Sequence, residues 1–178
     1  MLICFGFCVG LLCRRCNMTD IIYGFDIDAT IFDSSHRAKY LKNGELDLED
    51  WKSHSLELIL EDEPLALLRF MKHLLNSGAE VFICTSRNKC PSIIQLLEKW
   101  DINCKVIISR ALDDHRPDAE YKKARIGNAY KEYIEDGGEI VFFDDREDIR
   151  FALTEIGVKC YDPRIYNGKE NGNLRYLF

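Results

Sequence analysis

Short apolar runs alternate along this chain with longer amphipathic segments. Five runs have the length and the β-branched or aromatic content of buried strands, at residues 20–26, 80–85, 104–109, 139–144 and 158–162. Between them, apolar residues recur at helical spacing in the segments 61–78, 91–100, 118–135 and 146–157. Strands that alternate with helices favour a parallel sheet with helices on both faces. The pattern therefore predicts an α/β fold with a three-layer, Rossmann-like parallel sheet.

Proline and glycine mark the ends of the predicted helices. Pro64 suits the first turn of one helix, Gly78 ends that helix, and Pro91 opens the next. A glycine pair ends the long helix predicted over 118–135. The last sixteen residues are rich in Asn and Gly, so we expect a loop and tail there.

The connection between the first two predicted strands is longer than one crossover helix needs. Residues 33–60 are polar and mixed, with short helices expected within 47–60. We interpret 33–60 as a small helical cap insert over the site. Its aromatic residues Tyr40 and Trp51 are candidates for stacking on a nucleic-acid base. Aromatic residues in such a segment more often form a small core of the insert itself.

The first residues differ in character from the rest. Residues 2–13 form an apolar run that is shorter than the roughly 20 residues of a membrane span. Met18 stands directly before the first predicted strand and is a natural start. We therefore expect 1–17 to be an apolar, Cys-rich extension outside the fold and 18–178 to be one domain. A membrane-associating or targeting segment remains the alternative for 1–17.

Composition and charge narrow the function classes. The 178 residues are 47% hydrophobic and carry a net charge of −6, which does not fit an extended nucleic-acid-binding face. Eight cysteines are present, and those beyond the first sixteen residues are scattered, as in proteins of a reducing compartment. Cys13 and Cys16 have the spacing of half a zinc site, but no second pair follows at a usable spacing. These features predict a cytoplasmic protein.

Hydroxyl, guanidinium and carboxyl groups follow the predicted strands. They are Asp26 and Asp28 after the first, Thr85, Ser86 and Arg87 after the second, Ser109 and Arg110 after the third, and Asp144, Asp145 and Arg146 after the fourth. Ligands of open parallel sheets bind at the carboxyl ends of the strands. No P-loop and no GxGxxG motif accompanies them, so neither a nucleotide kinase nor a dinucleotide enzyme is supported.

The acids at two of these strand ends predict a cation site. Converging carboxylates repel one another strongly where water is partly excluded. Carboxylate oxygens suit Mg²⁺, which would remove that repulsion and bind phosphate oxygens. The candidate metal ligands are Asp26, Asp28, Asp144 and Asp145.

These motifs, in this order, resemble those of the haloacid dehalogenase superfamily of phosphohydrolases. In FDIDAT (25–30), the resemblance implies that Asp26 is the nucleophile and Asp28 the general acid/base. It implies a phosphate-binding hydroxyl from Thr85 or Ser86 and a catalytic lysine at Lys122. In FFDDRED (142–148) it implies metal-holding acids at Asp144 and Asp145, with Asp148 a weaker candidate.

The phosphatase domain of phage-type polynucleotide kinase-phosphatases is the more similar branch. The shared features are Arg37 after the first motif, Arg87 at the end of the second, and Arg116, Asp118 and Lys122 in RPDAEYK. The resemblance implies that Arg37, Arg87 and Asp118 bind phosphate or substrate. The chain departs from the family in having Ala29 where the family usually has Gly.

These observations leave three hypotheses for function. The first is a Mg²⁺-dependent phosphomonoesterase that forms an aspartyl-phosphate and acts on a nucleotide or a polynucleotide 3′-phosphate end. The second is a phosphatase for a small metabolite or a 5′-nucleotide. The third is a non-catalytic binding protein on the same fold. The sequence does not separate the first two, and it also leaves open whether His36 contacts substrate.

Overall fold

A computed structural model describes residues 21–39, 41–45, 47, 49–50, 56–88 and 91–168. The expectations for residues 1–17, Tyr40 and Trp51 lie outside the described residues.

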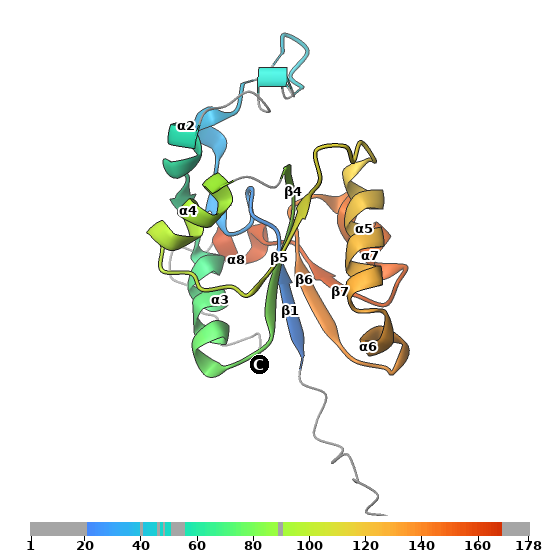
Figure 1. Ribbon diagram of the computed structural model, residues 1–178. Helices are drawn as coiled ribbons and strands as arrows, with labels where there is room; N and C mark the ends of the chain where they lie inside the picture. The colour runs from blue at the N-terminus through green and yellow to red at the C-terminus, as the bar shows by residue number, and fades with distance from the viewer. Residues whose placement is uncertain are drawn as a thin grey trace, which may run out of the picture.

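A five-stranded parallel sheet forms the centre of the molecule (Figure 1). Its strands, in spatial order, are β5 (Val106–Arg110), β4 (Val81–Asn88), β1 (Ile22–Phe25), β6 (Ile140–Phe143) and β7 (Lys159–Tyr161). The predicted α/β architecture is confirmed. β4 runs three residues beyond the predicted end, so Ser86 and Arg87 lie within the strand, where its register with β5 shifts between Thr85 and Asn88.

Helices cover both faces of the sheet (Figure 1). On one face lie α3 (Ala66–Ser77) and α4 (Pro91–Lys99), and on the other lie α5 (Asp118–Ala129), α6 (Lys131–Glu135) and α7 (Glu147–Thr154). Each layer buries its own apolar cluster against the sheet, one including Phe70 and Leu96 and the other including Tyr121 and Leu153. The sheet therefore holds two separate cores, as expected for strands that are apolar on both sides.

Gly24 shows how closely the layers pack around the central strand. A Cβ atom at this position would lie 2.3 Å from the ring of Phe82 and 2.4 Å from the ring of Phe142. These two aromatic residues come from the neighbouring strands β4 and β6 and stack with their ring centroids 5.8 Å apart. A glycine is therefore required for the two rings to meet across β1.

Three predicted boundaries are wrong. Pro64 lies in the short strand β3 (Glu63–Pro64), which pairs antiparallel with β2 (Phe32–Asp33), and α3 begins two residues later. The helix predicted over 118–135 is interrupted at Tyr130, whose φ of −119° is not helical. The Tyr130 ring packs 4.8 Å from that of Phe82, so this core contact accompanies the break.

The third correction concerns the predicted tail, which contains the short helix α8 (Arg164–Asn167). The Asn167 side chain accepts a hydrogen bond from the backbone N–H of Leu67 and donates one to the carbonyl of Thr30, at 2.9 and 3.0 Å. It thereby satisfies a backbone donor in the first turn of α3, whose own N-cap residue, Leu65, provides no side-chain hydrogen bond. Long-range contacts of this kind leave no local pattern in the sequence.

The insert contributes two short helical segments, η1 (Ser35–Arg37) and α2 (Leu56–Leu60). Figure 1 shows α2 beyond the carboxyl ends of the strands, close to α4. The bounds 33–60 and the role of this insert as a cap stay a prediction. Within the part of the chain that the structure describes, no helix is long and apolar enough to cross a membrane.

Candidate active site

The pairing of β1 with β6 brings the first two acids together. Phe25 and Phe143 are register partners, so Asp26 and Asp144 follow at adjacent strand ends. The backbone N–H of Asp26 donates to the carbonyl of Phe143 at 2.9 Å, which fixes the approach of the two chains. Both acids are buried, with exposed fractions of 6% and 0%.

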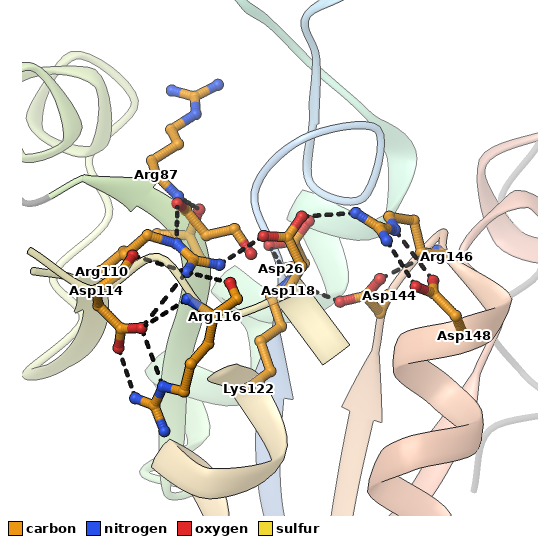
Figure 2. Close-up of polar contacts among 12 residues, drawn as sticks. Asp26, Arg87, Arg110, Asp114, Arg116, Asp118, Lys122, Asp144, Arg146 and Asp148 are labelled. Atoms are coloured by element: carbon orange, nitrogen blue, oxygen red, sulfur yellow. Dashed lines mark hydrogen bonds and ion pairs between the residues drawn. The ribbon is translucent and has the colours of Figure 1, made fainter. Parts of the chain in front are cut away.

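Lys122 supplies the positive charge between these acids. It projects from α5, is 1% exposed, and lies beneath the strand ends in Figure 2. Its Nζ donates to Oδ1 of Asp26 at 2.7 Å and to Oδ2 of Asp144 at 2.6 Å. Burial alone would lower the pKa of Lys122, but the two carboxylates raise it above its ordinary value, so the ammonium stays charged. Lys122, the lysine singled out by resemblance, thus lies against Asp26, and its catalytic role stays a prediction.

Asp145 completes a group of acids that fits a metal ion. One carboxylate oxygen each from Asp26, Asp144 and Asp145 lies within 4.8 Å of the others. Burial, followed by repulsion from Asp144, raises the pKa of Asp145 to about 6. Burial likewise raises the pKa of Asp26, with Asp144 and Asp28 adding to the effect. The three carboxylates together form an oxygen-rich donor set of the kind that binds a divalent metal ion.

The side chain of Asp28 belongs to a different cluster. It accepts hydrogen bonds from Ser34 at 2.8 Å, from Arg37 at 3.0 Å, and from two nitrogens of Arg87 at 2.8 and 2.6 Å. Burial alone would raise its pKa, but the guanidinium groups of Arg87 and Arg37 lower it to about 2. The carboxylate of Asp28 is therefore ionised and lies outside the three-acid group, although the sequence grouped it with the other three acids.

Asp62 is a member of this second cluster that the sequence reasoning missed. Its carboxylate is fully buried and accepts two hydrogen bonds from Arg37, at 2.8 and 3.1 Å, and one from Arg87 at 2.7 Å. It stands in the acidic run EDEP before α3, where it looks like an ordinary helix-preceding acid. The sequence contains no motif that separates it from its neighbours Glu61 and Glu63.

The hydroxyl groups of β4 lie beside Arg87. Thr85 is buried, and its Oγ1 accepts a hydrogen bond from the backbone N–H of Arg87 at 3.2 Å. The Oγ of Ser86 is buried and has no hydrogen-bond partner within the described ranges, and the same holds for Nη1 of Arg87. Figure 2 shows the Arg87 side chain extending away from Asp26 and Lys122. The assigned phosphate-binding role of these residues stays a prediction.

Asp118 lies in a bridge of ion pairs across the strand ends (Figure 2). Its carboxylate accepts from Arg110 of β5 at 2.5 Å and from Arg146, just before α7, at 2.6 Å. Arg146 also pairs with Asp148, which places Asp148 apart from the three-acid group. Arg116 pairs instead with Asp114. The predicted substrate contact of Asp118 therefore competes with two arginines that already hold it.

His36 has a contact within the insert. Its Nε2 lies 3.0 Å from the carbonyl oxygen of Leu58, beyond which lies Asp62 at 3.7 Å. The contact joins η1 to α2. No contact in the structure assigns His36 to substrate, so its role in binding stays a prediction.

Ala29 adopts a conformation that favours glycine. It follows Asp28 in the turn after β1, and its φ is +53°. The turn is closed by hydrogen bonds from the N–H groups of Ile31 and Phe32 to the carbonyl of Ile27. A left-handed conformation costs a residue with a Cβ about 1 kcal/mol. The left-handed backbone conformation at this position thus explains why the family that the sequence resembles usually has glycine here.

The fold and the acid cluster define a class of protein. The parallel sheet has acids at the ends of its first and fourth strands in chain order, and a buried lysine lies between them. A small insert follows the first strand. Together these features define a haloacid dehalogenase-like phosphohydrolase. Solved structures of this superfamily match the chain. One is a haloacid dehalogenase-superfamily hydrolase of subfamily IA from Geobacter sulfurreducens PCA, with a TM-score of 0.53, 16% identity, and 79% of this chain and 88% of that chain covered.

The particular family is shown by sequence. The family model described as bacteriophage T5 5′-deoxynucleotidase matches residues 14–173. The chain therefore belongs to this family and is a phosphatase. No curated protein sequence matches it.

Two further solved structures share the fold. A hydrolase from Streptococcus pneumoniae TIGR4 has a TM-score of 0.55 at 14% identity, with 81% of this chain and 92% of that chain covered. A chain of the Pnkp1/Rnl/Hen1 RNA repair complex has a TM-score of 0.57 at 17% identity, with 81% of this chain covered. The present chain spans only 42% of that repair protein.

Replacement of Ala29 by glycine tests the backbone strain. We expect Ala29→Gly to leave the protein as stable as the wild type or to stabilise it by up to about 1 kcal/mol, because relief of the left-handed strain offsets the entropy of glycine. Urea unfolding provides the measurement. Ala124→Gly, inside α5, is the matched control and should destabilise by about 1 kcal/mol. Equal losses for both variants would contradict the interpretation.

The raised pKa of Asp145 predicts a stability penalty in the absence of metal. The unfolded chain ionises Asp145 near its ordinary value of 3.8, whereas the folded chain keeps the proton to about pH 6. The folded state therefore loses stability as the pH rises from about 4 to 6. In EDTA at pH 7, we expect Asp145→Asn to be more stable than wild type by about 1–2 kcal/mol after solvent screening, and the difference to vanish near pH 3.

Denaturant unfolding across this pH range, with and without Mg²⁺, measures the effect. Added Mg²⁺ should stabilise the wild type more than Asp145→Asn. The control is Asp148→Asn, because the pKa of Asp148 is lowered by its hydrogen bonds with Arg146 and its neutralisation should bring no gain. If Asp145→Asn is no more stable than wild type in EDTA at pH 7, Asp145 does not belong to a strained acid cluster.

Proposed function

We propose that this chain is a Mg²⁺-dependent 5′-nucleotidase that removes the phosphate of deoxynucleoside monophosphates through an aspartyl-phosphate on Asp26. The observation that carries the proposal is the buried Asp26–Lys122–Asp144 arrangement in a chain of the 5′-deoxynucleotidase family. The family match favours the hypothesis of a 5′-nucleotide substrate over that of a polynucleotide 3′-phosphate end. The negative net charge also favours a small substrate over a long polynucleotide.

Contact with Lys122 supports Asp26 as the proposed nucleophile. Lys122 holds Oδ1 of Asp26, which fixes the carboxylate at the end of β1 and offsets its charge. In the first step a carboxylate oxygen of Asp26 forms a bond to phosphorus, and the bond from phosphorus to the nucleoside oxygen breaks. In the second step the oxygen of a water molecule forms a bond to phosphorus, and the bond from phosphorus to the Asp26 oxygen breaks, which releases inorganic phosphate and restores the carboxylate. Both steps depend mainly on positioning and charge stabilisation.

Asp28 carries the proton in this proposal. It protonates the departing nucleoside oxygen in the first step and takes a proton from water in the second. In the present structure its carboxylate is held ionised by Arg37 and Arg87. Asp28 must therefore take up a proton before it can protonate the nucleoside oxygen. In the proposal the phosphoryl oxygens take over the hydrogen bonds of these guanidinium groups, and Asp28, released from them, takes that proton from solvent. Thr85 and Ser86 stand on the same strand as Arg87 and complete the phosphate contacts.

The metal would be held by Asp26, Asp144 and Asp145, with the backbone carbonyl of Asp28 as a further oxygen ligand. When bound, Mg²⁺ offsets the charge of the phosphate and of the clustered acids. The ammonium of Lys122 contacts Asp26 and Asp144 and lowers the pKa of Asp145, but that pKa stays raised. One lysine therefore offsets the three acids only in part.

A substrate comparison tests the proposed activity. With Mg²⁺ present, phosphate release should be fastest for deoxynucleoside 5′-monophosphates. Slower release is expected for nucleoside 3′-monophosphates, sugar phosphates and a 3′-phosphorylated oligonucleotide of the same base. EDTA should abolish release, and Mg²⁺ should restore it. Preferential attack on the 3′-phosphorylated oligonucleotide would replace the 5′-nucleotidase proposal with the 3′-phosphatase alternative.

Removal of the nucleophile gives a sharper test of the chemistry. Asp26→Asn should lower kcat by at least about 10³-fold while the protein stays folded, because the amide cannot attack phosphorus. The measurement is phosphate release together with circular dichroism. Mass spectrometry after acid quench should show a phosphate adduct on the wild type and none on Asp26→Asn. Retention of substantial activity by the variant would exclude Asp26 as the nucleophile.

A further inference from the structure

Asp62 joins three parts of the chain at one buried point. It lies between α2 and β3, at the end of the insert, and its carboxylate is fully buried. Its two partners come from elsewhere, Arg37 from η1 and Arg87 from β4. Arg37 is held side-on, with Nε and Nη2 on the two carboxylate oxygens. Such a bidentate pair fixes the plane of the guanidinium as well as its position.

The second cluster, formed by Asp28, Asp62, Arg37 and Arg87, has no net charge only because Asp62 is present. Asp28 and Asp62 face Arg37 and Arg87, which gives two negative and two positive groups in a largely buried space. An uncompensated buried charge is strongly unfavourable. If Asp28 releases the arginines during the reaction, Asp62 is the carboxylate that still holds both of them.

Two buried polar groups next to this cluster have no partner in the described residues. They are Nη1 of Arg87, whose side chain is only 9% exposed, and Oγ of Ser86. Buried donors normally have a hydrogen-bond partner, so a buried donor without one requires an explanation. Both donors belong to consecutive residues of β4 and would be satisfied by an anionic oxygen. The geometry thus indicates that Arg37 and Arg87 bind an anionic ligand, and that Asp28 and Asp62 satisfy only some of the donors which that ligand would occupy.

From these contacts we infer that Asp62 is a positioning residue for the substrate's phosphate, acting through Arg37 and Arg87. This inference rests on the proposed phosphatase function and deepens it. Asp62 keeps both guanidinium groups beside the site when they exchange Asp28 for the oxygens of the phosphoryl group. It touches neither the phosphate nor the metal.

The test is a comparison of Asp62→Asn, Asp62→Glu and wild type on a deoxynucleoside 5′-monophosphate. Both variants should raise KM by about tenfold, since Asn removes the anchoring charge and Glu displaces it, while kcat changes by less than about threefold. A mutation that weakens binding of substrate and transition state equally has this signature. The constant for competitive inhibition by inorganic phosphate should rise by the same factor as KM.

A purely structural role gives a different result. Partial unfolding reduces the amount of active enzyme, so the apparent kcat falls while KM and the phosphate inhibition constant stay unchanged. Melting temperatures identify that case. Asp62→Glu keeps the charge and so provides a folded variant if Asp62→Asn does not fold. The matched control is Glu139→Gln, which removes a carboxylate paired with Lys159 at the opposite end of the sheet and should change neither constant.

The outcomes separate the two proposals. If wild type releases no phosphate from any nucleotide, the proposed function fails. If wild type is active and a folded Asp62 variant keeps the wild-type KM and phosphate inhibition constant, the positioning role of Asp62 is wrong while the function stands.

Discussion

The ammonium group of Lys122 lies between the carboxylates of Asp26 and Asp144, and all three side chains are almost fully buried. Without this cation, two acids at neighbouring strand ends would repel each other in a space that water barely reaches. The lysine comes from α5, which packs on one face of the sheet, so the docking of that helix and the ionisation of the site depend on each other. Lys122 also lowers the pKa of Asp145, but burial and then repulsion from Asp144 outweigh it and keep that pKa raised to about 6.

A second group of charges separates the two acids of the first motif. Asp26 and Asp28 are only two residues apart, yet the first faces a lysine and the second faces two arginines. The turn at Ala29, with its positive φ, directs the chain from β1 into the insert that carries Arg37. The two carboxylates therefore have opposite surroundings. Burial raises the pKa of Asp26, whereas the guanidinium groups lower that of Asp28. These shifts run opposite to the roles proposed for the two acids, because a nucleophile must be ionised and a general acid must carry a proton. The proposed reaction therefore depends on Lys122, which opposes the rise in the pKa of Asp26, and on the release of Asp28 from its two arginines.

Much of the architecture could be predicted because it follows from local patterns of apolar and polar residues along the chain. The alternation of apolar runs and amphipathic segments identified the five strands and the parallel sheet. Because the carboxyl ends of parallel strands meet at one edge, the sequence also brought Asp26 and Asp144 together. The resemblance of RPDAEYK added Lys122, which composition and spacing alone would have left as an ordinary helix residue. The boundaries were less reliable, since the break at Tyr130 accompanies packing against Phe82.

What only the tertiary structure decided is which charges face one another. Asp62 and Asn167 act through contacts with residues 25 or more positions away in the chain, and neither is distinguished from its neighbours by any local signal. Asn167, in α8, donates a hydrogen bond to the carbonyl of Thr30 in the turn after β1, although the two residues are 137 positions apart in the chain. The sequence by itself determined the sheet, the edge that carries the chemistry and the acids found there, because strand order and side-chain periodicity are local properties. The partners of Asp28 and Asp62 depend on the path of the insert, and the contacts of Asn167 depend on the path of α8; local patterns specify neither path.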